Sequence, residues 1–127
     1  MEGGRAIPER TRIAKELANL LGALSHPHRI RIIEELRSRE LDVNTLQQIL
    51  GISHSSVSQN LSVLRAHRVV SERREGRRVY YSLPQPELAE WLRSGLNFLE
   101  GDLAHSQEMR EALQRVKTLW GDGHVGR

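Results

Sequence analysis

The sequence predicts a mainly α-helical fold that carries one small β-hairpin. Along most of the chain, apolar residues recur at the three- and four-residue spacing of amphipathic helices. Residues 78–83 instead alternate between apolar and polar, and they follow a glycine, as the second strand of a hairpin does. A length of 127 residues with 38% hydrophobic residues corresponds to one domain.

The domain boundaries follow from where the helical pattern begins and ends. We expect a flexible N-terminus over residues 1–8, a single domain over residues 9–120 and a flexible C-terminus over residues 121–127. The first and last helical segments are expected at residues 9–24 and 87–120.

Two residues in the last segment weaken its helical pattern. Gly95 and Gly101 both have low helix propensity. At Gly101–Asp102, either a kink or a complete break of the helix is consistent with the sequence.

The middle of the chain has the pattern of short helices separated by turns. Gly51 follows a short apolar helix and is a typical stop signal, and Ser53 is a good N-cap for the helix after it. Two helices joined by the three-residue turn 51–53 form a helix-turn-helix. The expected segments are a helix from Pro27, a connector at residues 41–43, a helix at 45–50 capped by Asn44, and a helix from His54 to about Arg68.

A β-hairpin is predicted directly after the helix-turn-helix. Its strands are Val69–Arg74 and Arg78–Leu83, and its tip at residues 75–77 contains a glycine that can take a positive φ. A hairpin in this place is a wing. The prediction is therefore a winged helix-turn-helix, with about five to six helices and a two-stranded wing.

Composition and charge exclude several classes of protein. The chain has no cysteine, which excludes disulfides, thiolate metal sites and cysteine catalysis. It lacks an apolar stretch that could span a membrane and the apolar core of a signal peptide, so we expect a cytoplasmic protein that contacts no membrane. Residues 53–83 hold six arginines and two glutamates, and this central excess of positive charge suits a nucleic acid or is simply a solvated surface.

The second helix of the motif has an outer face suited to reading DNA bases. Its apolar residues Val57, Leu61 and Leu64 cluster on one side, which places Gln59 and several serines opposite. Serine and glutamine hydrogen-bond base edges, and glutamine can pair bidentately with adenine. The alternative is an ordinary polar helix surface, but such surfaces are usually rich in lysine and glutamate rather than serine.

Four arginines surround the predicted hairpin tip. They can reach phosphates or a narrow minor groove, although positive charge also protects an edge strand from unwanted pairing. The candidate DNA-binding residues are Ser53, His54, Ser55, Ser56, Ser58, Gln59 and Ser62 in the helix and Arg73, Arg74, Arg77 and Arg78 in the hairpin.

Three runs of sequence together resemble the ArsR/SmtB family of bacterial repressors: Leu24–Ile32, Ile52–Leu61 and Arg73–Leu83. The resemblance covers roughly residues 10–100. It implies a winged-helix dimer that is joined through its first and last helices, binds an imperfect palindrome and usually releases it when an inducer binds. It also places Ser55, Ser58 and Gln59 on the family's base-contacting positions.

The sequence departs from that family where many members bind metals. Asp42 and Asn44 occupy the positions of a cysteine pair, and the ligand positions of the last-helix site hold Gln85, Glu87, Phe98 and Gly101. A single remaining carboxylate is not a metal site, so we expect none, and no other cofactor. The sequence leaves one weak candidate open, or else a solvated polar stripe: Asp102, His105 and Glu108 on one helical face.

These observations predict a non-enzymatic repressor that binds palindromic double-stranded DNA as a homodimer. The main alternative is a winged helix that binds an acidic protein partner. A small-molecule inducer is left open, since the sequence identifies none. The expected dimer interface consists of Ile13, Leu17, Leu20 and Leu24 in the first helix and Leu88, Leu92, Leu96 and Leu99 in the last.

Overall fold

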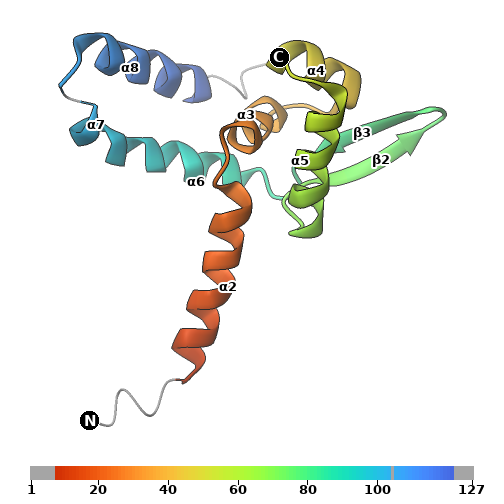
Figure 1. Ribbon diagram of the computed structural model, residues 1–127, viewed down its shortest axis with the longest axis horizontal. Helices are drawn as coiled ribbons and strands as arrows, with labels where there is room; N and C mark the ends of the chain where they lie inside the picture. The colour runs from red at the N-terminus through yellow and green to blue at the C-terminus, as the bar shows by residue number, and fades with distance from the viewer. Residues whose placement is uncertain (1–7, 104, 122–127) are drawn as a thin grey trace.

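The computed structural model describes residues 8–103 and 105–121 and is built around a three-helix unit with a hairpin beside it (Figure 1). None of the helices in these ranges is long and apolar enough to cross a membrane. The elements in chain order are α2 (Pro8–Leu24), α3 (Pro27–Leu36), β1 (Leu41–Asp42), α4 (Val43–Leu50), α5 (His54–Ala66), β2 (Ser71–Glu75), β3 (Arg78–Ser82), α6 (Glu87–Gly95), the 3₁₀ turn η1 (Leu96–Phe98), α7 (Leu99–Asp102) and α8 (Gln107–Gly121).

The core lies between α3, α4 and α5, which form the helix-turn-helix and its support. Ile32, Ile33, Leu46, Val57 and Leu64 are completely buried there. The turn between α4 and α5 forms as predicted, because Gly51 takes φ +68° and Ser53 caps α5. The winged helix-turn-helix predicted from the sequence is therefore confirmed.

Beside this core, the sheet has three strands rather than the two that were predicted. Leu41–Asp42 was expected to be a connector, but it pairs antiparallel with β3, so the strand order is β1-β3-β2. Leu41 is also buried in the core. A strand of two residues is too short to show an alternating pattern, so the sequence could not reveal it.

The start of α4 also differs from the prediction. Asp42, not Asn44, is the N-cap: its Oδ1 accepts a hydrogen bond of 2.8 Å from the backbone N–H of Thr45, and α4 begins at Val43. Aspartate and asparagine are about equally good N-caps, so residue type alone could not show which of the two precedes the first helical residue. The pairing of Asp42 in β1 fixes where the helix begins.

At the end of α5, the chain turns sharply into the wing. The backbone N–H of Val69 donates to the carbonyl of Leu64 across a left-handed Arg68 with φ +61°, a place where glycine is usual. Val69 and Val70 are consequently buried in the core, and β2 begins at Ser71 rather than at Val69. At the hairpin tip, Gly76 takes the predicted positive φ of 62°.

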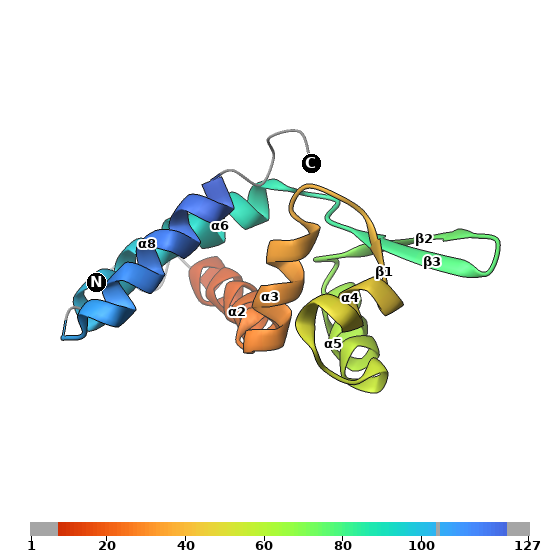
Figure 2. The same ribbon diagram turned by 90° about the horizontal axis from the view of Figure 1, so that it is seen from above.

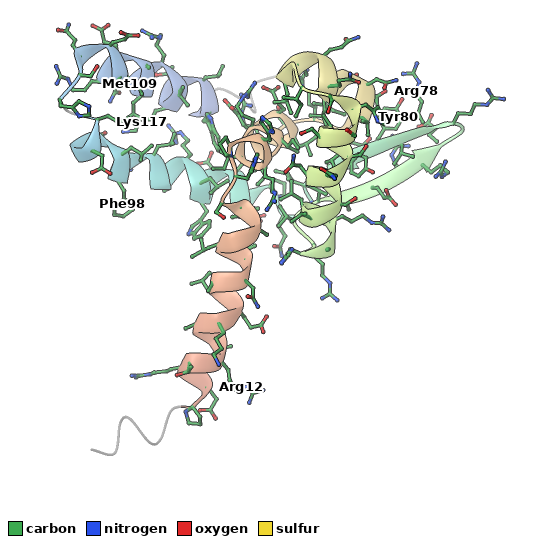
Figure 3. The ribbon with its side chains drawn as sticks, viewed as in Figure 1. Arg12, Arg78, Tyr80, Phe98, Met109 and Lys117 are labelled. Carbon is green, nitrogen blue, oxygen red and sulfur yellow. The ribbon has the colours of Figure 1, made fainter. Side chains whose placement is uncertain are left out.

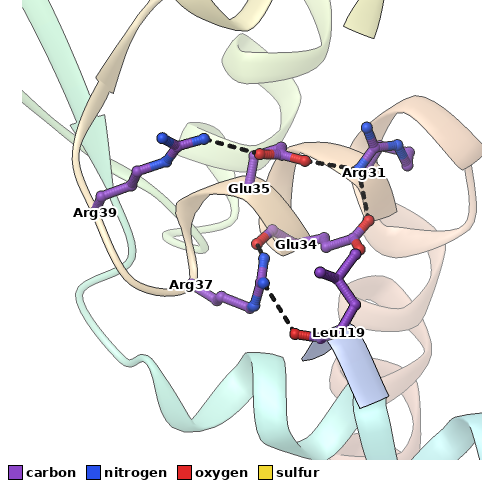
Figure 4. Close-up of polar contacts among 6 residues, drawn as sticks. All are labelled: Arg31, Glu34, Glu35, Arg37, Arg39 and Leu119. Atoms are coloured by element: carbon purple, nitrogen blue, oxygen red, sulfur yellow. Dashed lines mark hydrogen bonds and ion pairs between the residues drawn. The ribbon is translucent and has the colours of Figure 1, made fainter. Parts of the chain in front are cut away.

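The single long C-terminal helix that was predicted is interrupted in the structure. α7 ends at Asp102, directly after the weak point identified in the sequence, and α8 runs back alongside α6 (Figures 1 and 2). Trp120 anchors α8 in the core, and the guanidinium of Arg37 donates to the carbonyls of Glu34 and Leu119 (Figure 4). Arg37 therefore connects the end of α3 to the end of α8.

Candidate nucleic-acid interface

The local sequence fixes both the start and the orientation of α5. The Oγ of Ser53 accepts a hydrogen bond of 3.1 Å from the N–H of Ser56, which caps the helix. Val57, Leu61 and Leu64 are buried against the core. The opposite face is therefore held outward as one rigid surface.

The outward face of α5 consists of the residues that the helical spacing predicted. Ser55, Gln59 and Ser62 are exposed, and His54 is exposed at the start of the helix. Ser58 is half-buried at the side of this face. None of these side chains is large enough to keep a groove of DNA at a distance, and the hydroxyl and amide groups can donate and accept hydrogen bonds.

Two of the predicted DNA-contact serines, Ser53 and Ser56, also make hydrogen bonds that stabilise α5. The hydroxyl of Ser53 is the cap acceptor of α5 and lies 3.3 Å from the hydroxyl of Ser55. Ser56 is half-buried, and its carbonyl accepts a hydrogen bond from Asn60. Both serines remain DNA-contact predictions, but their first role is to shape the helix start.

The four arginines of the wing differ in their surroundings. Arg73 donates to both carboxylate oxygens of Glu40 at 2.8 and 3.1 Å and to Glu75 at 2.6 Å, and its guanidinium lies 5.0 Å from the ring centre of Tyr80. These hydrogen bonds to Glu40 and Glu75 raise the pKa of Arg73 above its usual value. The positive charge of Arg73 is therefore largely balanced within the protein.

Arg78 forms a longer ion pair than Arg73 does. Its Nη1 lies 3.5 Å from Oδ2 of Asp42. Arg78 begins β3 directly after the hairpin tip, where it pairs with Glu75, and Figure 3 labels both Arg78 and Tyr80 on the wing. Hydrogen bonding from Thr45, and then the charge of Arg78, hold the pKa of Asp42 below its usual range. Asp42 therefore stays ionised and links the start of α4 to the wing.

Arg74 and Arg77 are the remaining cations of the wing. Both are exposed, and neither side chain makes a hydrogen bond or an ion pair with any residue in the described part of the chain. Arg77 also lines a polar cleft of about 430 Å³ between α4, the start of α5 and the wing, and the charged pair Asp42 and Arg78 lines the same cleft beside His54. Because Arg78 is paired with Asp42, Arg77 supplies the excess positive charge that suits a phosphate in this cleft.

An acidic residue also holds the wing against α5. Glu72 in β2 forms an ion pair of 3.1 Å with Arg65 near the end of α5, and it accepts a hydrogen bond of 3.1 Å from the hydroxyl of Tyr81. The hairpin is thus fixed relative to the helix, and the two parts of the surface face outward together.

Sequence reasoning missed Asn60 and Arg29, two polar residues that lie behind this surface. Asn60 is only 8% exposed, and its Oδ1 accepts a hydrogen bond of 3.0 Å from Nε of Arg29. The signal was present, because Asn60 is a polar residue at a helical position between Val57 and Leu64, on the buried side of α5.

The structure separates the residues of the weak metal candidate. Asp102 ends α7, His105 lies in the turn after it, and Glu108 lies in the first turn of α8, so the three residues do not share the one helical face that this open candidate required. Within the described residues, no group of three histidine, aspartate or glutamate side chains could hold a metal ion. Phe98, at a position where relatives place a ligand, is 85% exposed.

The predicted dimer residues fall into two groups in the single chain. Leu24 is buried in the core of its own chain, and Leu20, Leu88 and Leu92 pack partly against that core. Leu96 is half-buried. Ile13, Leu17 and Leu99 are exposed, as are several apolar residues that were not predicted for the interface, among them Leu21, Trp91 and Phe98.

Comparison with known proteins gives consistent results. A family model described as a helix-turn-helix domain matches residues 24–73. The transcriptional repressor SmtB homolog of Synechocystis is 43% identical over 70 residues, which cover 55% of this chain and 53% of that protein. The biofilm growth-associated repressor of Xylella fastidiosa is 39% identical over 77 residues, which cover 61% of this chain and 68% of that protein.

The likeness extends to three-dimensional structure. The crystal structure of NolR from Sinorhizobium fredii matches with a TM-score of 0.66 and 34% identity, over 72% of this chain and 91% of that one. The chain spans about half to two thirds of the length of the curated relatives it matches. The fold, the positions of the helix-turn-helix and wing, and these similarities agree, and the chain belongs to the ArsR/SmtB family of winged helix-turn-helix regulators.

Proposed function

We propose that this protein is a transcriptional repressor that binds double-stranded DNA sequence-specifically, as a homodimer on a palindromic operator. The observation that carries the proposal is the surface formed by α5 and the wing. There an exposed serine and glutamine face lies beside Arg74 and Arg77, whose side chains have no partner among the described residues. Relatives that match this chain are named repressors. Because a repressor works beside the chromosome, we expect this protein to act in the cytoplasm.

Within this proposal, α5 enters the major groove and the wing contacts the backbone. The amide of Gln59 is suited to pair bidentately with an adenine, while Ser55 and Ser62 are short enough for either base edges or phosphates. Arg77 and the cleft beside His54 bind phosphate, which supplies affinity without sequence preference.

The exposed apolar surface of α2 supports a second copy as partner. This helix of 17 residues extends away from the rest of the chain, and only Ala23 and Leu24 at its end are buried (Figure 1). Helices in proteins gain most of their stability from the packing of an apolar face, yet Ile13 in this helix is 66% exposed. A symmetric contact with another α2 and with Trp91, Phe98 and Leu99 would cover these residues and present two copies of α5.

A metal ion is a poor candidate for the inducer of this protein. The carboxylate of Asp42 already binds Thr45 and Arg78. The other positions where the family places metal ligands include the exposed Phe98 and Gly101, which have no side-chain donor. We therefore propose that induction, where it occurs, uses a small molecule or a protein that binds near the terminal helices.

Selection of duplexes from a random-sequence pool, followed by mobility shifts at increasing salt, tests the main proposal. The expected result is an enriched palindrome whose half-sites lie about one helical turn apart, bound more tightly than random DNA. A protein that binds all duplexes equally, or none, would contradict the proposal. In that case an acidic protein becomes the better candidate for its partner.

A further inference from the structure

Arg29 connects three helices through one side chain. It lies in the first turn of α3, where its Nη1 donates to the carbonyl of Ala23 at 3.0 Å and its Nε donates to Oδ1 of Asn60 at 3.0 Å. Ala23 belongs to the last turn of α2, and Asn60 lies in the middle of α5. The planar guanidinium thus fixes the end of α2 relative to α5.

The orientation of the Asn60 side chain leaves no alternative partner in place of Arg29. The amide nitrogen of Asn60 donates to the carbonyl of Ser56 at 2.8 Å, so its oxygen must face Arg29. Asn60 is buried, and a buried amide oxygen without a donor is costly. The contact lies on the inner side of α5, away from Gln59, so Arg29 does not itself lie on the surface that faces DNA.

The contact with α2 is favourable for a similar reason. Carbonyl groups in the last turn of a helix lack partners within the helix and carry partial negative charge. The guanidinium of Arg29 satisfies this need by donating to the carbonyl of Ala23.

We propose that Arg29 is a positioning residue that sets the geometry of α5 relative to α2, and thereby the separation of the two α5 helices in the dimer. This inference rests on the proposed function, in which α2 holds the second copy and α5 reads the bases. If α2 joins the two copies, the distance between the reading helices depends on how firmly each α5 is held to its own α2. Arg29 provides that connection through Ala23 and Asn60.

The test compares two arginines of the same helix. Arg29→Met removes both contacts, whereas Arg31→Met removes only ion pairs within α3, those with Glu34 and Glu35 (Figure 4). Each variant is measured on the duplex that the wild type selects from a random pool, and on versions with one base pair added or removed between the half-sites. Thermal unfolding and sedimentation establish that each variant is folded and dimeric.

We expect the wild type and Arg31→Met to bind the respaced duplexes much more weakly than the selected one. Arg29→Met should bind the selected duplex about tenfold more weakly, the usual effect of losing a charged hydrogen bond. The further loss of affinity that Arg29→Met shows on the respaced duplexes should be clearly smaller than that of the wild type. The reason is that its two α5 helices are less firmly held. A merely structural role would lower stability without changing this discrimination between spacings.

Variants of the partner residue make the test independent of Arg29. Asn60→Asp keeps an oxygen acceptor for Arg29, whereas Asn60→Leu removes it, so only the leucine variant should relax the spacing preference. Equal spacing penalties in all of these variants would overturn the positioning role while leaving DNA binding intact. A wild-type protein that enriches no duplex would overturn both proposals.

Discussion

Arg77→Ala and Arg73→Ala should affect DNA binding differently, although both remove one positive charge from the wing. Arg77 has no ion pair or hydrogen bond within the described residues and lines the polar cleft beside α5. Each phosphate contact changes the slope of log K against log salt by about 0.9. Because a dimer loses two contacts, Arg77→Ala should make the slope shallower by about 1.8.

Arg73 should contribute much less to that slope. It already balances Glu40 and Glu75, so it has little free charge with which to displace counterions from DNA. We expect Arg73→Ala to change the slope by less than half the effect of Arg77→Ala. The main consequence should be a looser contact between the wing and the segment before β1, visible as faster amide hydrogen exchange in β2.

Fluorescence anisotropy measures these slopes directly, with a labelled duplex titrated at several salt concentrations between about 50 and 200 mM. Random duplex of the same length serves as the control. Losing a phosphate contact should weaken binding to the selected duplex and to the random duplex alike. Equal slope changes for the two variants would refute the reasoning, since it assigns Arg73 to the protein and Arg77 to the DNA.

Four further predictions concern specificity, assembly, stability and metals. Gln59→Ala should cost about 1–3 kcal/mol on the selected duplex and little on random DNA, measured by anisotropy. Ile13→Glu should convert the dimer, at twice 14.5 kDa, to a monomer in sedimentation, while the exposed, charged Arg12 mutated to Glu should not. Asp42→Ala should lower the free energy of unfolding by about 0.5–2 kcal/mol at pH 7 through loss of the cap. Because the folded-state pKa of Asp42 is lowered, this difference should persist above about pH 4 and shrink as the pH falls further, which denaturant unfolding at several pH values checks. Zinc up to about micromolar should leave the complex with the selected duplex unchanged in a mobility shift, and a stoichiometric release of DNA would contradict this.

The sequence predicted those parts of the fold that depend on local pattern. Helical spacing located α2 to α6, and Gly51 and Gly76 both take the positive φ that their turns required. What it missed depends on contacts between distant segments. The pairing of Leu41–Asp42 with β3 joins residues about forty positions apart, and the interruption after Asp102 allows Trp120 to reach the core.

The candidate DNA-binding surface also has a part that local sequence predicts and a part that depends on distant contacts. The outward face of α5 was predictable because the buried residues of one helix determine which side remains exposed. The unequal roles of the wing arginines were not, because Arg73 is bound not only by the neighbouring Glu75 but also by Glu40, 33 residues away. A cluster of arginines in a sequence therefore overestimates the charge that is free to meet DNA.

Asp42 shows how a position can exchange one use for another within a family. The resemblance places it where metal-sensing members have a cysteine, and here its two oxygens contact the start of α4 and Arg78, beside the tip of the wing. A thiol is a weak acceptor and is not among the favoured N-caps, and when neutral it offers no charge to Arg78. The capping link and a thiolate ligand are therefore mutually exclusive at this residue. The aspartate does more than remove a metal ligand, because it gives the helix-turn-helix a fixed connection to its wing that a metal-free cysteine could not provide.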